Sequence, residues 1–167
     1  AVNIGRGIEL MIEAMPLLDE YLFIVIGDGD ILKELIEKVM RLNLNNKVKF
    51  IGKITPDKLK KLTLNGTIGI SLEEDLGLNY RFALPNKIFD YLHAKIPILT
   101  ADLPEMRALI EKYSVGEILH ERTPEVLAKT IMSMTKKSYT KELTLAKEKL
   151  KRAKEKKKLT SIFFKLD

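Results

Sequence analysis

Short apolar runs alternate with segments of helical periodicity along this chain, and that alternation restricts its fold more than any other feature. Strands that are apolar on both faces and separated by single helices are typical of a parallel sheet covered by helices on both sides. The sequence therefore predicts the α/β class, with a doubly wound, Rossmann-like parallel sheet. The five predicted strands lie within residues 21–30, 48–52, 67–72, 96–100 and 115–119.

The first predicted element is a helix, because the apolar residues from Ile8 to Met15 repeat at helical spacing. Rossmann-like domains are built from units that begin with a strand. We therefore expect a first strand to be missing, immediately before Ala1, and the chain to be a piece of a longer protein.

The predicted organisation is one domain over residues 1–135, followed by a basic helical tail over residues 136–167. Within the tail, small and apolar residues form a narrow stripe at helical spacing, with lysines elsewhere. We expect the tail to be a helix that lies on a surface. The stripe consists of Leu143, Ala146, Leu150 and Ala153.

Positive charge is concentrated in this tail. The net charge is +6, yet residues 136–158 hold 11 Lys or Arg against 3 Glu, which gives +8 there and leaves −2 for the rest. A slightly acidic body lacks the basic stripe that binds a nucleic-acid backbone, so no nucleic-acid partner is expected. For the tail we expect peripheral contact with an anionic membrane surface. The expected location is cytoplasmic, at the inner face of the membrane.

Composition excludes several kinds of chemistry. There is no cysteine, so disulfides and thiol catalysis are excluded. The two histidines, His93 and His120, lie far apart in the sequence, and we expect no metal centre. No apolar run approaches the roughly 20 residues that span a bilayer.

The connection over residues 73–87 is the strongest candidate for a ligand site. Strand-to-helix connections usually have about two to six residues, and longer ones are often functional. In doubly wound sheets, ligands bind beyond the carboxyl ends of the strands, where this connection begins. The following helix is expected to start near Pro85, because proline is favoured in a first turn. Its N-terminus would attract an anion.

Two cations at expected helix starts favour an anionic ligand. Lys87 lies in the first turn, where a cation is disfavoured by about 0.3 to 1 kcal/mol unless an anion is bound. Arg6 lies between Gly5 and Gly7, which would allow close approach of a ligand. Together Arg6 and Lys87 predict a diphosphate site. On spacing alone, Lys87 fits equally a surface ion pair with Asp90.

Four segments resemble the nucleotide-sugar-binding, C-terminal domain of retaining GT-B glycosyltransferases of group 1. The likeness extends to about Met134 and is most specific in the last of these segments. It implies one half of a two-domain GT-B fold, with the donor held by this half and the acceptor by the other. The segments are GRGIELMIEAM (5–15), VIGDGD (25–30), VKFIGKITPDKLKKL (48–62) and PNKIFDYLHAKIPILTADLPEMRALI (85–110).

The resemblance implies roles for particular residues. Arg6 stands where the family has a basic residue on the donor diphosphate, and Asp90 stands at the second acid of the paired-glutamate motif, which contacts the nucleotide ribose. Lys87 belongs to a PNK variant found in subfamilies that make surface polysaccharides. The expected donor-binding residues are Arg6, Asn79, Asn86, Lys87 and Asp90.

The motif also departs from the family. Its first acid should lie eight residues before Asp90, where this chain has Phe82. The partner of the donor sugar is therefore left open between Asn79, Tyr80 and an acid within residues 73–75.

The function that the resemblance implies is transfer of a sugar from a nucleoside-diphosphate sugar to a saccharide or lipid-linked acceptor, in polysaccharide or cell-surface glycan synthesis. The catalytic residues stay unknown, because an acceptor-side base would lie outside this chain, and no cofactor or metal is expected. Two alternatives remain open: a nucleotide-sugar epimerase of the same architecture, and a non-catalytic α/β ligand-binding module.

Overall fold

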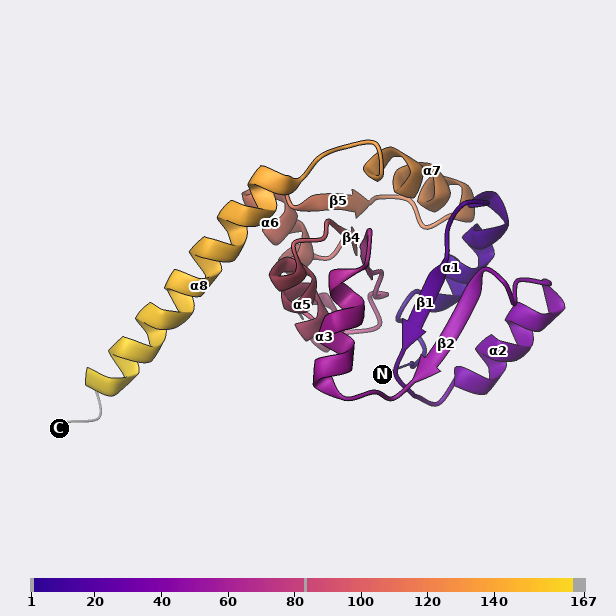
Figure 1. Ribbon diagram of the computed structural model, residues 1–167, viewed down its shortest axis with the longest axis horizontal. Coiled ribbons are helices and arrows are strands. Elements are labelled where there is room, and N and C mark those ends of the chain that lie inside the picture. Colours follow the sequence, from indigo (N-terminus) through magenta and orange to yellow (C-terminus); the bar gives the residue numbers. More distant parts are fainter. Residues whose placement is uncertain (1, 83, 164–167) are drawn as a thin grey trace.

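The computed structural model describes residues 2–82 and 84–163 and contains parallel strands flanked by helices (Figure 1). This arrangement confirms the predicted α/β, Rossmann-like class. All five predicted strands are present: β1 (Phe23–Ile26), β2 (Val48–Gly52), β3 (Gly69–Ser71), β4 (Ile98–Ala101) and β5 (Gly116–Leu119). The helices are α1 (Ile8–Ala14), the 3₁₀ turn η1 (Met15–Leu17), α2 (Leu32–Arg41), α3 (Pro56–Leu64), α4 (Leu78–Arg81), α5 (Asn86–Ala94), α6 (Pro104–Tyr113), α7 (Pro124–Met134) and α8 (Thr140–Phe163).

The strands form two parallel sheets. β1 pairs with β2, and a separate sheet has the order β3-β4-β5. In the described part of the chain, β1 and β3 share no ladder, so the five strands do not form one continuous sheet. The strand expected before Ala1 lies outside the described residues and stays a prediction.

The N-terminal segment connects the two sheets at their carboxyl ends. The Val2 N–H donates to the carbonyl of Asp28, beyond β1, at 2.9 Å. The Gly5 carbonyl accepts from the N–H of Glu74, beyond β3, at 2.8 Å. These two bonds hold the segment before α1 across the carboxyl ends of β1 and β3.

All four residues of β4 are buried. The β3-β4-β5 sheet is therefore covered on both faces. Ile98 belongs to one core cluster, with residues of α5, α6 and the start of α8. Its neighbour Leu99 belongs to the other cluster, with residues of α1, α2 and α7. Adjacent strand residues point to opposite faces. The predicted doubly wound packing is therefore confirmed.

Thr140–Phe163, within the predicted tail, form helix α8, and its first turns pack on the rest of the fold. Leu143 and Ala146 are buried in the same cluster as Ile98, and Leu150 is partly buried there. The side chain of Ala153 lies outside the described residues. Farther on, α8 extends away from the rest of the molecule (Figure 1). None of the helices described here is long and apolar enough to cross a membrane.

The connection before α5 differs in detail from the prediction. Pro85 is the N-cap, with extended backbone, so the helix begins one residue later, at Asn86. The connection also contains a short helix, α4, that the sequence did not predict. Gly77 precedes it with φ +145°, a conformation that side chains other than glycine rarely adopt.

Candidate functional site

Arg6 reaches the carboxyl edge because glycines flank it. Gly5 and Gly7 have φ of +76° and +74°, in the left-handed region that favours glycine. A Cβ on Gly7 would lie 2.3 Å from the carbonyl oxygen of Leu72, just beyond β3. The segment therefore passes against the exit of β3 at a distance that only glycine permits, and this contact places Arg6 there.

Lys87 arrives at the same place from α5. Its Nζ lies 2.8 Å from Oε1 of Glu73, whereas Asp90 makes no ion pair within residues 2–82 and 84–163. The surface pair of Lys87 with Asp90, which spacing allowed, is therefore not formed. The lysine in the first turn is compensated by a carboxylate from another element, as helix electrostatics requires.

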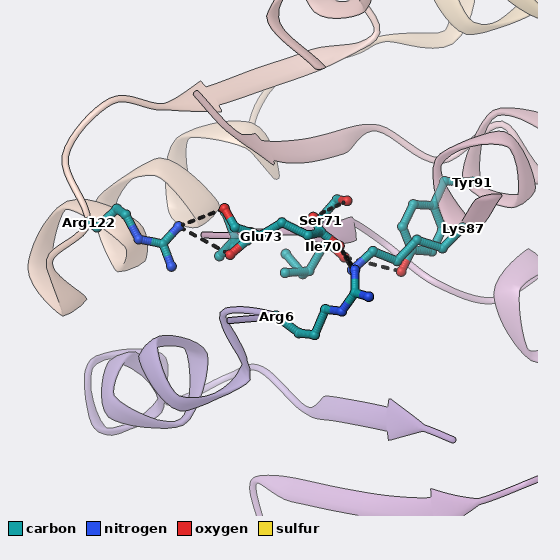
Figure 2. Close-up of polar contacts among 8 residues, drawn as sticks. Arg6, Ile70, Ser71, Glu73, Lys87, Tyr91 and Arg122 are labelled. Atoms are coloured by element: carbon teal, nitrogen blue, oxygen red, sulfur yellow. Dashed lines mark hydrogen bonds and ion pairs between the residues drawn. The ribbon is translucent and has the colours of Figure 1, made fainter. Parts of the chain in front are cut away.

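Glu73 is the residue on which both cations converge. Its side chain is 2% exposed, and Oε1 lies 3.7 Å from Nη1 of Arg6 as well as 2.8 Å from Lys87. Its Oε2 accepts a hydrogen bond from the hydroxyl of Ser71 at 2.8 Å. Figure 2 shows Arg6 and Lys87 approaching this carboxylate from two elements. A buried carboxylate is expected only where cations or donors surround it.

Arg122 secures the backbone on the other side of this cluster. Its Nη1 donates to the carbonyl of Leu72 at 3.1 Å and to that of Glu73 at 3.5 Å (Figure 2). Its Nη2 lies 3.4 Å from a carboxylate oxygen of Glu74. The turn after β3 is thus held by the loop after β5, as well as by the segment before α1 and by α5. Sequence reasoning missed Arg122, which stands 49 residues from Glu73.

Tyr91, on α5 like Lys87, packs beside the cluster (Figure 2). Its hydroxyl donates to the carbonyl of Ile70 at 3.3 Å. Burial, and then the nearby charge of Glu73, raise the pKa of Tyr91 to about 12. A Cβ on Gly69 would lie 2.3 Å from the Tyr91 ring, so the ring packs directly on β3. Tyr91 is therefore a neutral hydrogen-bond donor at physiological pH.

The short helix α4 borders the cluster on its exposed side. The Arg6 guanidinium lies over the ring of Tyr80, 5.2 Å from its centroid, which is within the range of a cation–π contact. Asn79, the neighbouring residue, is exposed. Asp75 accepts from Nε of Arg81 at 2.9 Å, and this hydrogen bond raises the pKa of Arg81. The ion pair fixes α4 against the loop that precedes it.

The structure brings only some of the predicted residues together. Arg6 and Lys87 both lie near Oε1 of Glu73, so these two predicted residues are neighbours. Asn86 and Asp90 are exposed and one turn apart on α5, on the helix that carries Lys87. Whether Asn79, Asn86 and Asp90 contact a ligand stays a prediction.

A second cluster of polar side chains lies beyond β4 and β5, at the same edge of the sheet. Asp102 accepts from Nδ1 of His120 at 3.1 Å and pairs with Arg107. No role was predicted for these residues as a group. Over the ranges that the structure describes, no group of three or more histidine, cysteine, aspartate or glutamate residues could hold a metal ion.

Nearly the whole chain matches the model of one protein family. The model of the family described as "Glycosyl transferases group 1" matches residues 3–159. The chain belongs to this family. The match continues past Met134, where the predicted likeness ends, and includes much of α8. A search of curated protein sequences found no match.

Solved structures of glycosyltransferases share the fold. HepE of Anabaena, in complex with UDP, is 17% identical with a TM-score of 0.79, over 99% of this chain and 47% of HepE. WaaG, a glycosyltransferase involved in lipopolysaccharide biosynthesis, is 17% identical with a TM-score of 0.68, over 87% of this chain and 40% of WaaG. The C-terminal domain of LpcC, a group 1 family protein from Francisella tularensis, is 18% identical with a TM-score of 0.69, over 88% of this chain and 78% of that domain. The chain spans less than half the length of HepE and WaaG.

Proposed function

We propose that this chain is the donor-binding half of a glycosyltransferase and holds a nucleoside-diphosphate sugar at the carboxyl edge of its sheets. One observation carries the proposal: Arg6 and Lys87 come from different elements and converge at this edge, each about one-third exposed. In the proposed complex they hold the diphosphate, Asp90 holds the ribose, and Asn79 and Asn86 border the donor. Family membership and the position beyond the strand ends support this assignment.

The proposed chemistry relies on positioning and on charge. The bond between the sugar C1 and the diphosphate oxygen breaks, and its electron pair leaves with the diphosphate, while an acceptor hydroxyl forms a new bond to C1. Arg6, Lys87 and the N–H groups at the start of α5 would neutralise the departing charge, so the proposal requires no metal or other cofactor. A base for the acceptor proton would come from the other half of the enzyme.

The nature of the donor and acceptor is a finer part of the proposal. A UDP-sugar is the first donor to test, because HepE was solved with UDP and with UDP-glucose. A saccharide or lipid-linked acceptor, in polysaccharide or surface-glycan synthesis, is supported by WaaG, which is involved in lipopolysaccharide biosynthesis. Family membership favours glycosyl transfer over the epimerase and the non-catalytic module.

The ribose assignment predicts a selective loss of binding in Asp90→Ala. A carboxylate that accepts from a hydroxyl contributes roughly 1.5 to 3 kcal/mol, so UDP should bind about 10- to 150-fold more weakly. The free energy of unfolding should barely change, because Asp90 is exposed. Calorimetric titration measures the dissociation constants of UDP and of 2′,3′-dideoxy-UDP for the wild-type chain and for the variant.

The dideoxy nucleotide is the control, because it lacks the hydroxyls that Asp90 would serve. The variant should bind it as the wild-type chain does. Equal weakening of both nucleotides, or of neither, would show that Asp90 does not contact the ribose. GDP and ADP, titrated in the same way, test the choice of base.

We extend the proposal to the tail, which would attach the enzyme weakly to the inner, anionic face of the cytoplasmic membrane. The excess charge of residues 136–158 supports this contact. Sedimentation with vesicles that contain anionic lipid should remove the chain from solution at low salt and not at high salt. Negligible binding at both salt concentrations would contradict membrane attachment.

A further inference from the structure

Buried Glu73 has a position that the proposed donor site does not by itself explain. We propose that Glu73 is an internal counter-anion: it occupies Arg6 and Lys87 in the ligand-free protein, and an incoming diphosphate competes with it for both cations. This inference rests on the proposed function, in which the same two cations hold the donor diphosphate.

The two oxygens of Glu73 are held in different ways. Oε2 accepts a hydrogen bond from Ser71 at 2.8 Å. Oε1 faces Lys87 at 2.8 Å and Arg6 at 3.7 Å, yet neither contact has hydrogen-bond geometry, and this buried oxygen has no hydrogen-bond partner among the described residues. The buried Nε of Arg6 likewise lacks a partner there. The cations are therefore attracted to Glu73 by charge and are not fully satisfied by it.

Exposure shows from which side a competing anion would come. The side chains of Arg6 and Lys87 are 32% and 35% exposed, whereas that of Glu73 is 2% exposed. The carboxylate thus lies on the inner side of both cations, and their outer sides face solvent. An anion in solution can reach Arg6 and Lys87 without entering the protein interior.

The backbone around Glu73 is fixed, so the carboxylate cannot withdraw by moving the chain. Arg122 holds the carbonyls of Leu72 and Glu73 from one side (Figure 2). The Gly5 carbonyl accepts from the N–H of Glu74 at 2.8 Å on the other. Competition is therefore expected to act on the two long cationic side chains, which turn from the buried carboxylate towards a bound anion.

The physical consequence is a moderated affinity for diphosphate. Without a counter-ion, the partly buried side chains of Arg6 and Lys87 would repel one another and would bind a diphosphate product tightly. When no diphosphate is bound, Glu73 would keep them close together, and it lowers the positive charge that an incoming ligand meets. In a transferase this arrangement would speed release of the nucleoside diphosphate after the sugar has left.

Calorimetric titration of inorganic pyrophosphate into the wild-type chain, Glu73→Gln and Glu74→Gln tests the competition. Glutamine keeps the size of the side chain and an oxygen for Ser71, but it removes the charge. Glu73→Gln should bind pyrophosphate about tenfold more tightly, as expected for one unit charge removed close to the anion and partly screened. Glu74→Gln is the matched control, because Glu74 pairs with Arg122 at 3.4 Å instead. Its affinity should stay within about twofold of wild type.

Each other outcome has a defined meaning. Unchanged or weaker binding by Glu73→Gln would overturn the competition, and equal tightening by Glu74→Gln would reduce it to a general charge effect. If pyrophosphate binds to none of the three proteins, this proposal fails together with the anion site. If pyrophosphate behaves as expected but no nucleoside diphosphate binds, the donor proposal fails and the role of Glu73 stands.

If Glu73→Gln does not fold, the variant Glu73→Asp provides a second test. Glu73→Asp keeps the buried charge but withdraws it by one methylene from both cations. Pyrophosphate should then bind about threefold more tightly, because the Coulomb attraction to the carboxylate weakens with distance. Unchanged or weaker binding by this variant would equally overturn the proposal.

Discussion

Gly7→Ala is expected to destabilise the protein by about 3 kcal/mol, since it combines a left-handed backbone with a steric overlap. Gly7 has φ +74°, and a Cβ there would lie 2.3 Å from the carbonyl oxygen of Leu72 and 2.5 Å from its Cβ. The chain cannot move away freely, because the Gly5 carbonyl is bonded to the N–H of Glu74. Urea unfolding followed by circular dichroism measures the change, as the chain has no tryptophan.

Gly52→Ala separates the two causes. Gly52 has φ +75°, almost the same as Gly7, but nothing lies within 4 Å of a Cβ built there. Its replacement should cost about 1 kcal/mol, from the backbone alone. If both variants lose the same stability, the contact between Gly7 and Leu72 yields without strain, and the close passage that places Arg6 is not enforced by sterics.

Lys87→Met is expected to reduce pyrophosphate and UDP binding by about 10- to 150-fold, because it removes one charged partner of the diphosphate. It should also destabilise the protein. Glu73 would stay buried with Arg6 3.7 Å away as its nearest cation. We expect a loss of about 1 to 2 kcal/mol, below the value for a fully buried pair, because Lys87 is 35% exposed. Calorimetry and urea unfolding measure the two effects.

Two further variants make this prediction specific. Lys58→Met removes an exposed lysine from the first turn of α3 and should change neither quantity. The double variant Lys87→Met with Glu73→Gln should recover most of the lost stability, since no uncompensated carboxylate is then buried. If the double variant is no more stable than Lys87→Met, the buried charge is not the cause of the loss.

Part of the candidate site is readable from the sequence because its signals are local. A cation in a first helical turn conflicts with the helix dipole, and this conflict identified Lys87 as a residue that needs an anion. Glycines on both sides identified Arg6 in the same way. Glu73 was named only as one of three acids that could contact the donor sugar, because nothing local distinguishes it from Glu74 and Asp75.

The sequence by itself determined the α/β class and the five strands, and it singled out Arg6 and Lys87 as candidate site residues. Each depends on periodicity or on backbone preference within a few residues. Only the tertiary structure decided that Lys87 pairs with Glu73 and not with Asp90, and that Arg122 supports the turn after β3. These contacts join the segment before α1, helix α5 and the loop after β5 at the end of β3. The physical reason is that a carboxylate only 2% exposed needs cations or hydrogen-bond donors around it. Tertiary packing supplies these groups from segments that lie far apart in the chain.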